Sequence, residues 1–125
     1  MSDRIVLTIP REQPFHEVAH LVLGGVAARL NLTFESIDDL ETALDAVLER
    51  AALYGHITIK LRVEAEAILA TVGPVAEAVR AELEREPGEH FDLRRILDTV
   101  LDGYELDSEG WLELRKEVAG QGSGS

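Results

Sequence analysis

The chain has 125 residues, of which 24 are acidic and 12 are basic, so its formal net charge at pH 7 is −12. This length suits one domain, and an apolar share of 46% is enough for a core, which argues against intrinsic disorder. The negative charge argues against binding to nucleic acid or to anionic lipid, because both require clustered lysine and arginine. With no cysteine in the chain, disulfides, thiolate zinc sites and cysteine nucleophiles are excluded.

The N-terminal sequence carries no apolar signal segment, and no apolar run approaches the ~20 residues that span a bilayer. We therefore expect a cytoplasmic protein that makes no contact with a membrane. Residues 120–125 contain only glycine, glutamine and serine, and they are expected to be a flexible tail.

The first half of the chain predicts one strand and two helices. Residues 4–9 are rich in β-forming side chains, and residues 14–30 have apolar side chains at helical spacing. The paired glycines at 24 and 25 lie inside this first helix and predict close packing or a kink. The second helix is expected to run from a cap at Ser36 to Tyr54, with Gly55 ending it.

The second half of the chain predicts two β-hairpins and, between them, two short helices. These elements fall at residues 56–72, 75–86, 93–101 and 104–118. The strict alternation of apolar and polar residues from His56 to Val63 is the clearest strand signal, and Asp92 is expected to cap the second of the two helices. The whole order predicts a two-layer α+β sandwich, with helices on one face of a mixed, mostly antiparallel sheet.

One motif, His16-Glu17-Val18-Ala19-His20, matches the H-E-x-x-H pattern of zinc hydrolases. Two histidines one helical turn apart can both bind Zn²⁺, and Glu17 would be the general base. However, the residue at the familiar place of a third ligand is Val26, and no other candidate stands out. We therefore interpret His16 and His20 as rim residues of an amphipathic helix and expect no metal or cofactor. A zinc hydrolase remains the alternative.

The second predicted helix carries a row of carboxylates at residues 38, 39, 41, 45 and 49. Such a row is typical of a solvated helix face, a divalent-metal site or a contact with a basic partner. Nucleophilic catalysis and phosphate binding by a glycine-rich loop have no support, because the G-x-S-x-G, P-loop and G-x-G-x-x-G motifs are missing from the sequence.

Four stretches occur in a fixed order along the chain. They are RIVLTIP at 4–10, LVLGGVAARL with FESIDDL at 21–40, TVGP at 71–74, and LRRILDTVLD with GWLELRKEV at 93–118. In this order they resemble the ATPase-like domain of bacterial anti-sigma regulatory factors, the serine-protein-kinase branch of the GHKL (Bergerat-fold) superfamily. The resemblance covers about residues 4–118 and implies a single ATPase-like α+β domain over residues 1–119.

In that family the second helix bears a glutamate that orients water and, four residues later, an asparagine that binds magnesium. The resemblance places Ala46 and Arg50 at these positions. Of the family's Asp-x-Gly-x-Gly motif only Gly73 remains, with Thr71 in place of the aspartate that reads adenine. These four residues are therefore expected to form a vestigial nucleotide site, and we predict that the chain is not an enzyme. The alternative is an active serine-protein kinase that uses ATP and Mg²⁺.

The resemblance also implies a function, a regulatory domain that binds protein in the control of transcription. Its expected partner is a sigma factor or an anti-sigma antagonist, and residues 35–50, with six acids and one base, would suit a basic surface. The candidate contact residues are Asp38, Asp39, Glu41, Arg50 and Trp111. A homodimer is a further alternative, because Trp111 is expected on the outer side of the last strand.

Overall fold

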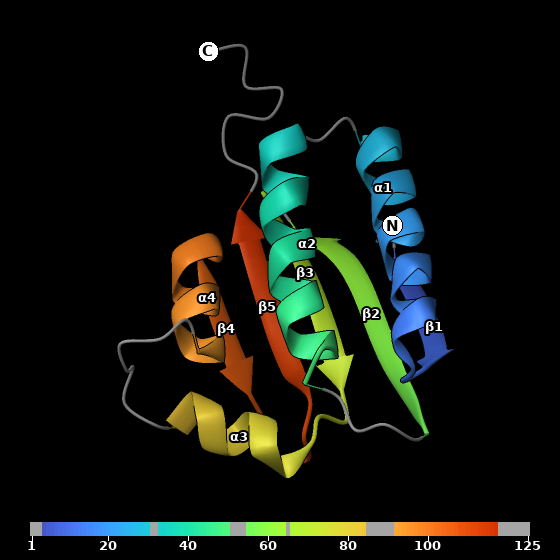
Figure 1. The fold of residues 1–125 in the computed structure, drawn as a ribbon. Helices are drawn as coiled ribbons and strands as arrows, with labels where there is room; N and C mark the ends of the chain where they lie inside the picture. Colours follow the sequence, from blue (N-terminus) through green and yellow to red (C-terminus); the bar gives the residue numbers. More distant parts are fainter. Residues whose placement is uncertain (1–3, 31–32, 51–54, 65, 85–91, 118–125) are drawn as a thin grey trace.

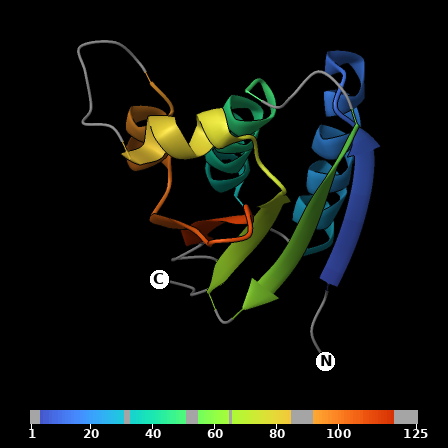
Figure 2. The ribbon, with the colours of Figure 1, turned by 90° about the horizontal axis from the view of Figure 1, so that it is seen from below.

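The computed structural model describes residues 4–30, 33–50, 55–64, 66–84 and 92–117. Over these ranges the chain forms two layers, a five-stranded sheet and helices packed on one of its faces (Figure 1, Figure 2). The strands are β1 (Arg4–Pro10), β2 (His56–Glu64), β3 (Ala67–Gly73), β4 (Gly103–Leu106) and β5 (Leu112–Glu117). The helices are α1 (His16–Leu30), α2 (Phe34–Leu48), α3 (Glu77–Glu84) and α4 (Leu93–Val100), with a 3-10 turn, η1 (Gln13–Phe15), before α1.

The sheet has the strand order β1-β2-β3-β5-β4, and each of these neighbouring pairs is antiparallel. Both predicted hairpins, β2 with β3 and β4 with β5, are present. The predicted two-layer α+β sandwich is therefore confirmed. Strand β1 lies at one end of the sheet, so one of its edges is paired with β2 and the other is at the margin of the molecule.

The core lies between the sheet and the helices, as the alternation in β2 predicted. Ile57 and Ile59 are each 1% exposed, because every second side chain of a strand points to the same face. Leu40 and Leu44 of α2 and Leu97 of α4 cover them from the helical layer and are also buried. Helix α2 packs against both α1 and α4 and so occupies the middle of this layer (Figure 1).

Helix α2 begins and ends earlier than the sequence predicted. Its N-cap is Thr33, whose hydroxyl oxygen accepts a hydrogen bond from the Ser36 backbone N–H, so the predicted cap at Ser36 is wrong. The helix ends at Leu48 rather than at Tyr54, which lies outside the described residues. Gly55 has a φ of +90°, in the left-handed region that glycine adopts at little cost.

The two glycines of α1 do not mark a close contact within the chain. The helix continues through Gly24 and Gly25, and a Cβ atom built at either position would meet no other atom within 4 Å. The predicted close packing is therefore wrong, because both glycines lie on the exposed face of the helix rather than on the face that contacts the sheet.

Among the described helices, α1 and α2 are the longest, with 15 residues each. Within these ranges no helix combines the length and the apolar character that are needed to cross a bilayer.

Candidate functional site

The polar face of α2 is flanked by two hollows. The first, with a volume of about 410 Å³, separates α2 from α4, and we call it the α2–α4 groove. Its lining residues are Thr42, Asp45, Ala46, Glu49, Ile96, Thr99 and Val100. The second, of about 240 Å³, separates α1 from α2 and is lined by His16, Glu17, His20, Asp45 and Glu49. Asp45 and Glu49 line both hollows, so these two carboxylates form the ridge between them.

Arg50, just beyond the end of α2, is held by two sets of hydrogen bonds. Its Nε atom donates to both carboxylate oxygens of Glu82 at 3.1 Å, and its Nη1 atom donates to the carbonyl oxygen of Ala46 at 2.8 Å. The side chains of Arg50 and Glu82 are only 25% and 17% exposed. The Arg50 guanidinium is therefore engaged within the fold at the position that the resemblance assigns to a magnesium ligand.

The Glu82 carboxylate has a second partner, because it also accepts a hydrogen bond from the Leu93 backbone N–H at the start of α4. One carboxylate thus joins the end of α2, the middle of α3 and the beginning of α4. Glu82 was not predicted from the sequence, because it lies 32 residues from Arg50 and no local pattern connects the two. The charged composition of α3 was the available signal, and it indicated only a solvated helix.

Of the four residues predicted to form a vestigial nucleotide site, Ala46 and Arg50 lie together, and Thr71 and Gly73 lie on a different element. Ala46 lines the α2–α4 groove, and Arg50 is bound to Glu82. Thr71 and Gly73 belong to β3, and the side chain between them, Val72, is buried in the core. Because neighbouring residues of a strand point to opposite faces, Thr71 and Gly73 lie on the sheet face away from α2.

Trp111 lies on that same outer face and is half-buried. The ring sits against Gly73, where an added Cβ would come within 2.7 Å of a ring carbon. The Lys60 ammonium lies over the ring at 4.4 Å from its centroid, in the geometry of a cation–π contact. Trp111 and the polar face of α2 are therefore on opposite sides of the sheet.

The other candidate contact residues differ in their surroundings. Asp38 is exposed on the first turns of α2. Asp39 accepts a hydrogen bond from the Lys116 ammonium at 2.9 Å, and the same ammonium donates to the Val100 carbonyl oxygen. Asp39 therefore ties α2 to β5, whereas Glu41 lies 3.7 Å from a ring nitrogen of His20.

The two histidines of the H-E-x-x-H motif have different partners. His16 is buried, and its Nε2 atom donates to the carbonyl oxygen of Arg11 at 3.1 Å, so that nitrogen is committed to the backbone. His20 lies at the rim, where its Nε2 atom is 2.6 Å from the carboxylate of Asp45. In the part of the chain that the structure describes, no group of three or more histidine, aspartate or glutamate side chains is arranged to hold a metal ion.

Comparison with known proteins gives distant relatives that share one name. No family model matches the chain. It is 22% identical over 126 residues to the serine-protein kinase RsbW of Listeria innocua serovar 6a, covering 85% of this chain and 80% of that protein. The values are the same for the serine-protein kinase RsbW of Listeria monocytogenes serotype 4a. For that of Oceanobacillus iheyensis, the identity is 33% over 54 residues, which are 43% of this chain and 34% of the relative.

These relatives confirm the predicted resemblance to the serine-protein-kinase branch, and they correct one prediction. From the sequence we predicted that the chain is not an enzyme, whereas each of these relatives is named a serine-protein kinase. The prediction relied on Ala46 and Arg50 in place of the family's glutamate and asparagine, and on Thr71 and Gly73 as the remnant of its Asp-x-Gly-x-Gly motif. In the structure Asp45 and Glu49, one residue earlier on the helix, both line the α2–α4 groove.

The contact between His20 and Asp45 joins α1 to α2, and we predict that its contribution to stability depends on pH. The hydrogen bond to Asp45 raises the pKa of His20 above its usual 6.5, and partial burial opposes this rise. A group whose pKa is raised by folding stabilises the fold while it is protonated. The contribution is therefore complete below about pH 6.5 and is lost as the pH rises through the pKa of the folded state.

The free energy of unfolding is measured for the wild type and for His20→Gln at several pH values between about 5.5 and about 8.5. We expect the advantage of the wild type over His20→Gln to shrink as the pH rises. Asp45→Asn is the matched control and should remove most of this pH dependence while keeping the histidine. A difference between wild type and His20→Gln that stays constant across the range would contradict the prediction.

Proposed function

We propose that this chain is a regulator of the serine-protein-kinase and anti-sigma type that binds a protein partner in the control of transcription. The observation that supports this most is the similarity, over 85% of the chain, to proteins named serine-protein kinase RsbW. The two-layer α+β fold agrees with that similarity. The partner would be a sigma factor or an antagonist of an anti-sigma factor.

The surface best suited to such a partner is the acidic face of α2, which we define as Asp38, Glu41, Asp45 and Glu49. These residues are three or four positions apart, so they follow one side of the helix. Asp45 and Glu49 also border the α2–α4 groove, whose opposite wall is formed by Ile96, Thr99 and Val100 of α4. A basic segment with apolar side chains would match this combination of negative charge and a partly apolar groove.

Arg50 and Asp39, two of the contact residues expected from the sequence, stabilise the fold instead of contacting the partner in this proposal. Arg50 is bound to Glu82, and Asp39 is bound to Lys116, so each carries a charge that the fold already pairs. The proposed contact with the partner therefore rests first on the exposed Asp38 and Glu49. Glu41 and Asp45 lie between them on the same face, where both also contact His20.

We predict that reversing a charge on this face weakens partner binding. The partner is first captured with the chain from the native host and identified by mass spectrometry, and its affinity is then measured with purified proteins. Glu49→Lys is expected to weaken binding roughly threefold to tenfold at low salt, and less at high salt because salt screens the interaction. Glu105→Lys, the same change of charge at an exposed position of strand β4, is the matched control and should have little effect. Equal effects of the two substitutions would contradict the proposed surface.

A second candidate function, phosphoryl transfer from ATP to a serine of the partner, is favoured by the names of the relatives and by the groove itself. Mg²⁺ bound with a nucleotide requires oxygen ligands, and the carboxylates of Asp45 and Glu49 are of this type. Arg50 supplies no such ligand, because a guanidinium has only donor groups.

If phosphoryl transfer occurs in the groove, labelled phosphate should move from ATP to the captured partner in the presence of Mg²⁺. Glu49→Gln keeps the size of the side chain and removes its charge, and it is expected to lower the transfer rate at least about tenfold. Glu105→Gln is the matched control and should transfer at the wild-type rate. Transfer that is insensitive to Glu49→Gln would place the reaction elsewhere, and no transfer at all would remove this second candidate.

A further inference from the structure

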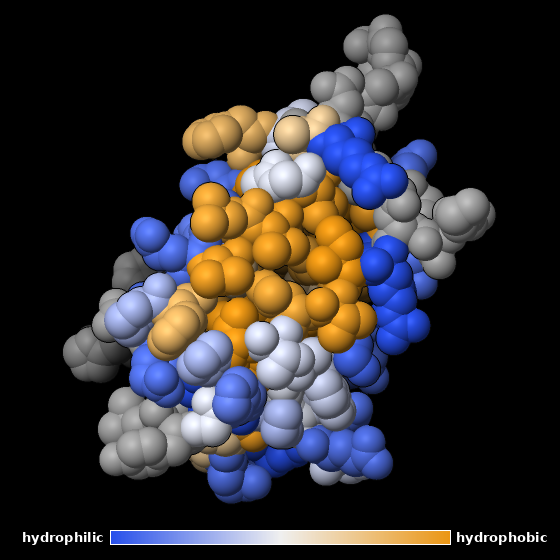
Figure 3. Space-filling model, turned by 90° about the vertical axis from the view of Figure 1, so that its right-hand side faces the viewer, coloured by the Kyte–Doolittle hydropathy of each residue, from blue (hydrophilic) through white to orange (hydrophobic). Residues whose placement is uncertain are grey.

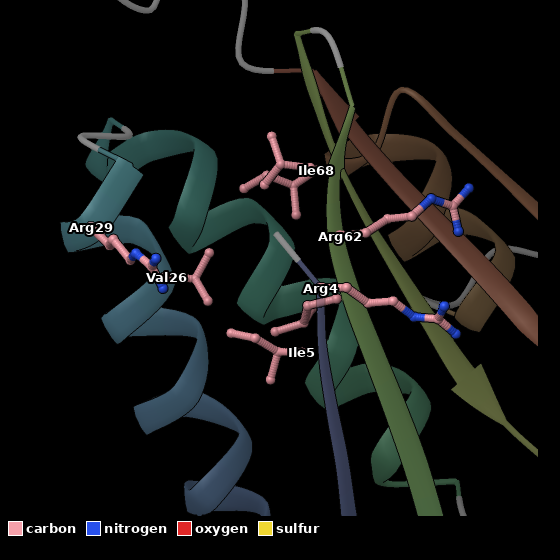
Figure 4. A pocket seen from close by; sticks show the side chains of 8 residues that line it. Arg4, Ile5, Val26, Arg29, Arg62 and Ile68 are labelled. Atoms are coloured by element: carbon pink, nitrogen blue, oxygen red, sulfur yellow. The ribbon is translucent and has the colours of Figure 1, made fainter. Parts of the chain in front are cut away.

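A pocket of about 70 Å³ lies between the C-terminal end of α1 and the sheet, and we call it the α1–sheet pocket (Figure 4). Its apolar lining consists of Ile5, Val26, Leu61, Val63 and Ile68. Figure 4 shows Ile5, Val26 and Ile68 pointing toward one another from the helix and from the sheet. Because Val26 and Ile68 are buried, the pocket reaches into the core. The face of the molecule that carries α1 and β1, which border the pocket, also shows a broad apolar area (Figure 3).

The size and lining of the α1–sheet pocket suit the end of a short aliphatic chain. A buried water needs two to four polar partners, which apolar side chains do not offer. An apolar cavity binds small apolar groups instead, and one of about 150 Å³ can hold a benzene molecule. The smaller pocket described here has room for about two or three carbon atoms, since a water molecule takes up about 30 Å³ of the liquid.

The charged residues that line the α1–sheet pocket are all basic. They are Arg4, Arg29 and Arg62, and none of the pocket's lining residues within the described ranges is acidic. In contrast, the α2–α4 groove and the hollow between α1 and α2 are each lined by two or more carboxylates. In a chain with a net charge of −12, the α1–sheet pocket is therefore a place that attracts an anion.

Of these three arginines, Arg29 is the one on the same side of the sheet as the pocket. Figure 4 shows Arg4 and Arg62 extending to the other side, where Arg62 pairs with two glutamates. Arg29 extends from the last turn of α1 beside Val26. A guanidinium has five N–H donors, so it can bind a carboxylate through two of them while it keeps other contacts.

The apolar pattern of α1 is interrupted at Arg29. Ala19, Leu23 and Val26 are buried on the side of the helix that faces the sheet, and residue 29 is the next position at this spacing. An apolar side chain there would extend the core, whereas Arg29 is exposed and borders the pocket. A position at which a sequence departs from the pattern of its own fold is often a functional one.

We infer that the α1–sheet pocket binds a short aliphatic monocarboxylate of about four to six carbon atoms. The end of its chain would lie among Ile5, Val26 and Ile68, and its carboxylate would accept hydrogen bonds from the guanidinium of Arg29. A cation of the same length would be repelled by the arginines, and an alcohol would lack the charge that the guanidinium binds. This inference does not depend on the proposed function, because the described lining of this pocket shares no residue with the acidic face of α2 or with the α2–α4 groove.

The test titrates the purified chain with sodium pentanoate at constant ionic strength and follows the backbone amide signals by NMR. The wild type should show saturable shifts that are largest for the residues of the pocket. A ligand this small is expected to have a dissociation constant of about 1 mM. 1-Pentanol, which has the chain without the charge, should bind about tenfold more weakly. Acetate, which has the charge without the chain, should not saturate in the range in which pentanoate does.

Two variants separate the role of the charge from the role of the apolar lining. Arg29→Gln should raise the dissociation constant of pentanoate about tenfold and leave that of 1-pentanol unchanged. Val26→Leu adds a methylene group beside the pocket and should weaken the binding of both ligands, because it takes up space that the chain would fill. Arg95→Gln, the same substitution at an exposed position of α4, is the matched control and should bind pentanoate like the wild type.

The amide spectrum of each variant also establishes whether its fold is kept, and the comparison of pentanoate with 1-pentanol in the wild type needs no variant. A wild type that shows no saturable shift with pentanoate would overturn the inference. Shifts that are centred away from the pocket, or an affinity for pentanoate that both Arg29→Gln and Val26→Leu leave unchanged, would overturn it as well.

Discussion

The arrangement of the helical layer depends on the carboxylate of Glu82. It accepts hydrogen bonds from the guanidinium of Arg50 and from the first backbone N–H of α4, and so connects the ends of α2 and α4 through α3. Both side chains are largely buried, so the loss of either partner would leave the other charge without compensation, which is more costly than the loss of an exposed ion pair. This pair therefore fixes the ends of α2 and α4 between which the α2–α4 groove opens.

With its end fixed in this way, α2 packs into the core on its sheet side and presents charged side chains on its solvent side. Toward the sheet it contributes Leu40, Leu44 and Val47 to the core, and toward solvent it presents the acidic face. On the α1 side, Asp45 is bound to His20, and on the α4 side the same residue borders the groove. A change of protonation at His20 would therefore alter the charge next to the proposed partner surface.

Most of the fold could be predicted from the sequence because its signals are local. The alternation in β2, the cap at Asp92 and the two hairpins each depend on residues within a few positions of one another. The start of α2 was misjudged because Thr33 and Ser36 are both good N-cap residues, and only the structure shows which one accepts the hydrogen bond. The glycines of α1 were misjudged because a sequence does not state which helix face contacts the sheet.

The candidate site was less predictable, because it is made by contacts between distant parts of the chain. The Arg50–Glu82 and Lys116–Asp39 pairs join residues 32 and 77 positions apart. The resemblance placed Arg50 within the second helix, whereas it lies just beyond the end of α2, and it gave no sign that Glu82 would bind it. It also grouped Thr71 with Ala46, although the pleat of β3 directs Thr71 to the other face of the sheet.

The most direct test of this account is the coupling energy between Arg50 and Glu82, measured by a double-mutant cycle. The free energy of unfolding is determined for the wild type, Arg50→Ala, Glu82→Ala and the double variant. The hydrogen bond from the Leu93 backbone N–H is lost in both variants that lack Glu82, so its effect cancels in the cycle. We expect a favourable coupling of about 1–3 kcal/mol, as for a partly buried and hydrogen-bonded charge pair. Two substitutions that are additive to within about 0.5 kcal/mol would contradict the role given to this pair.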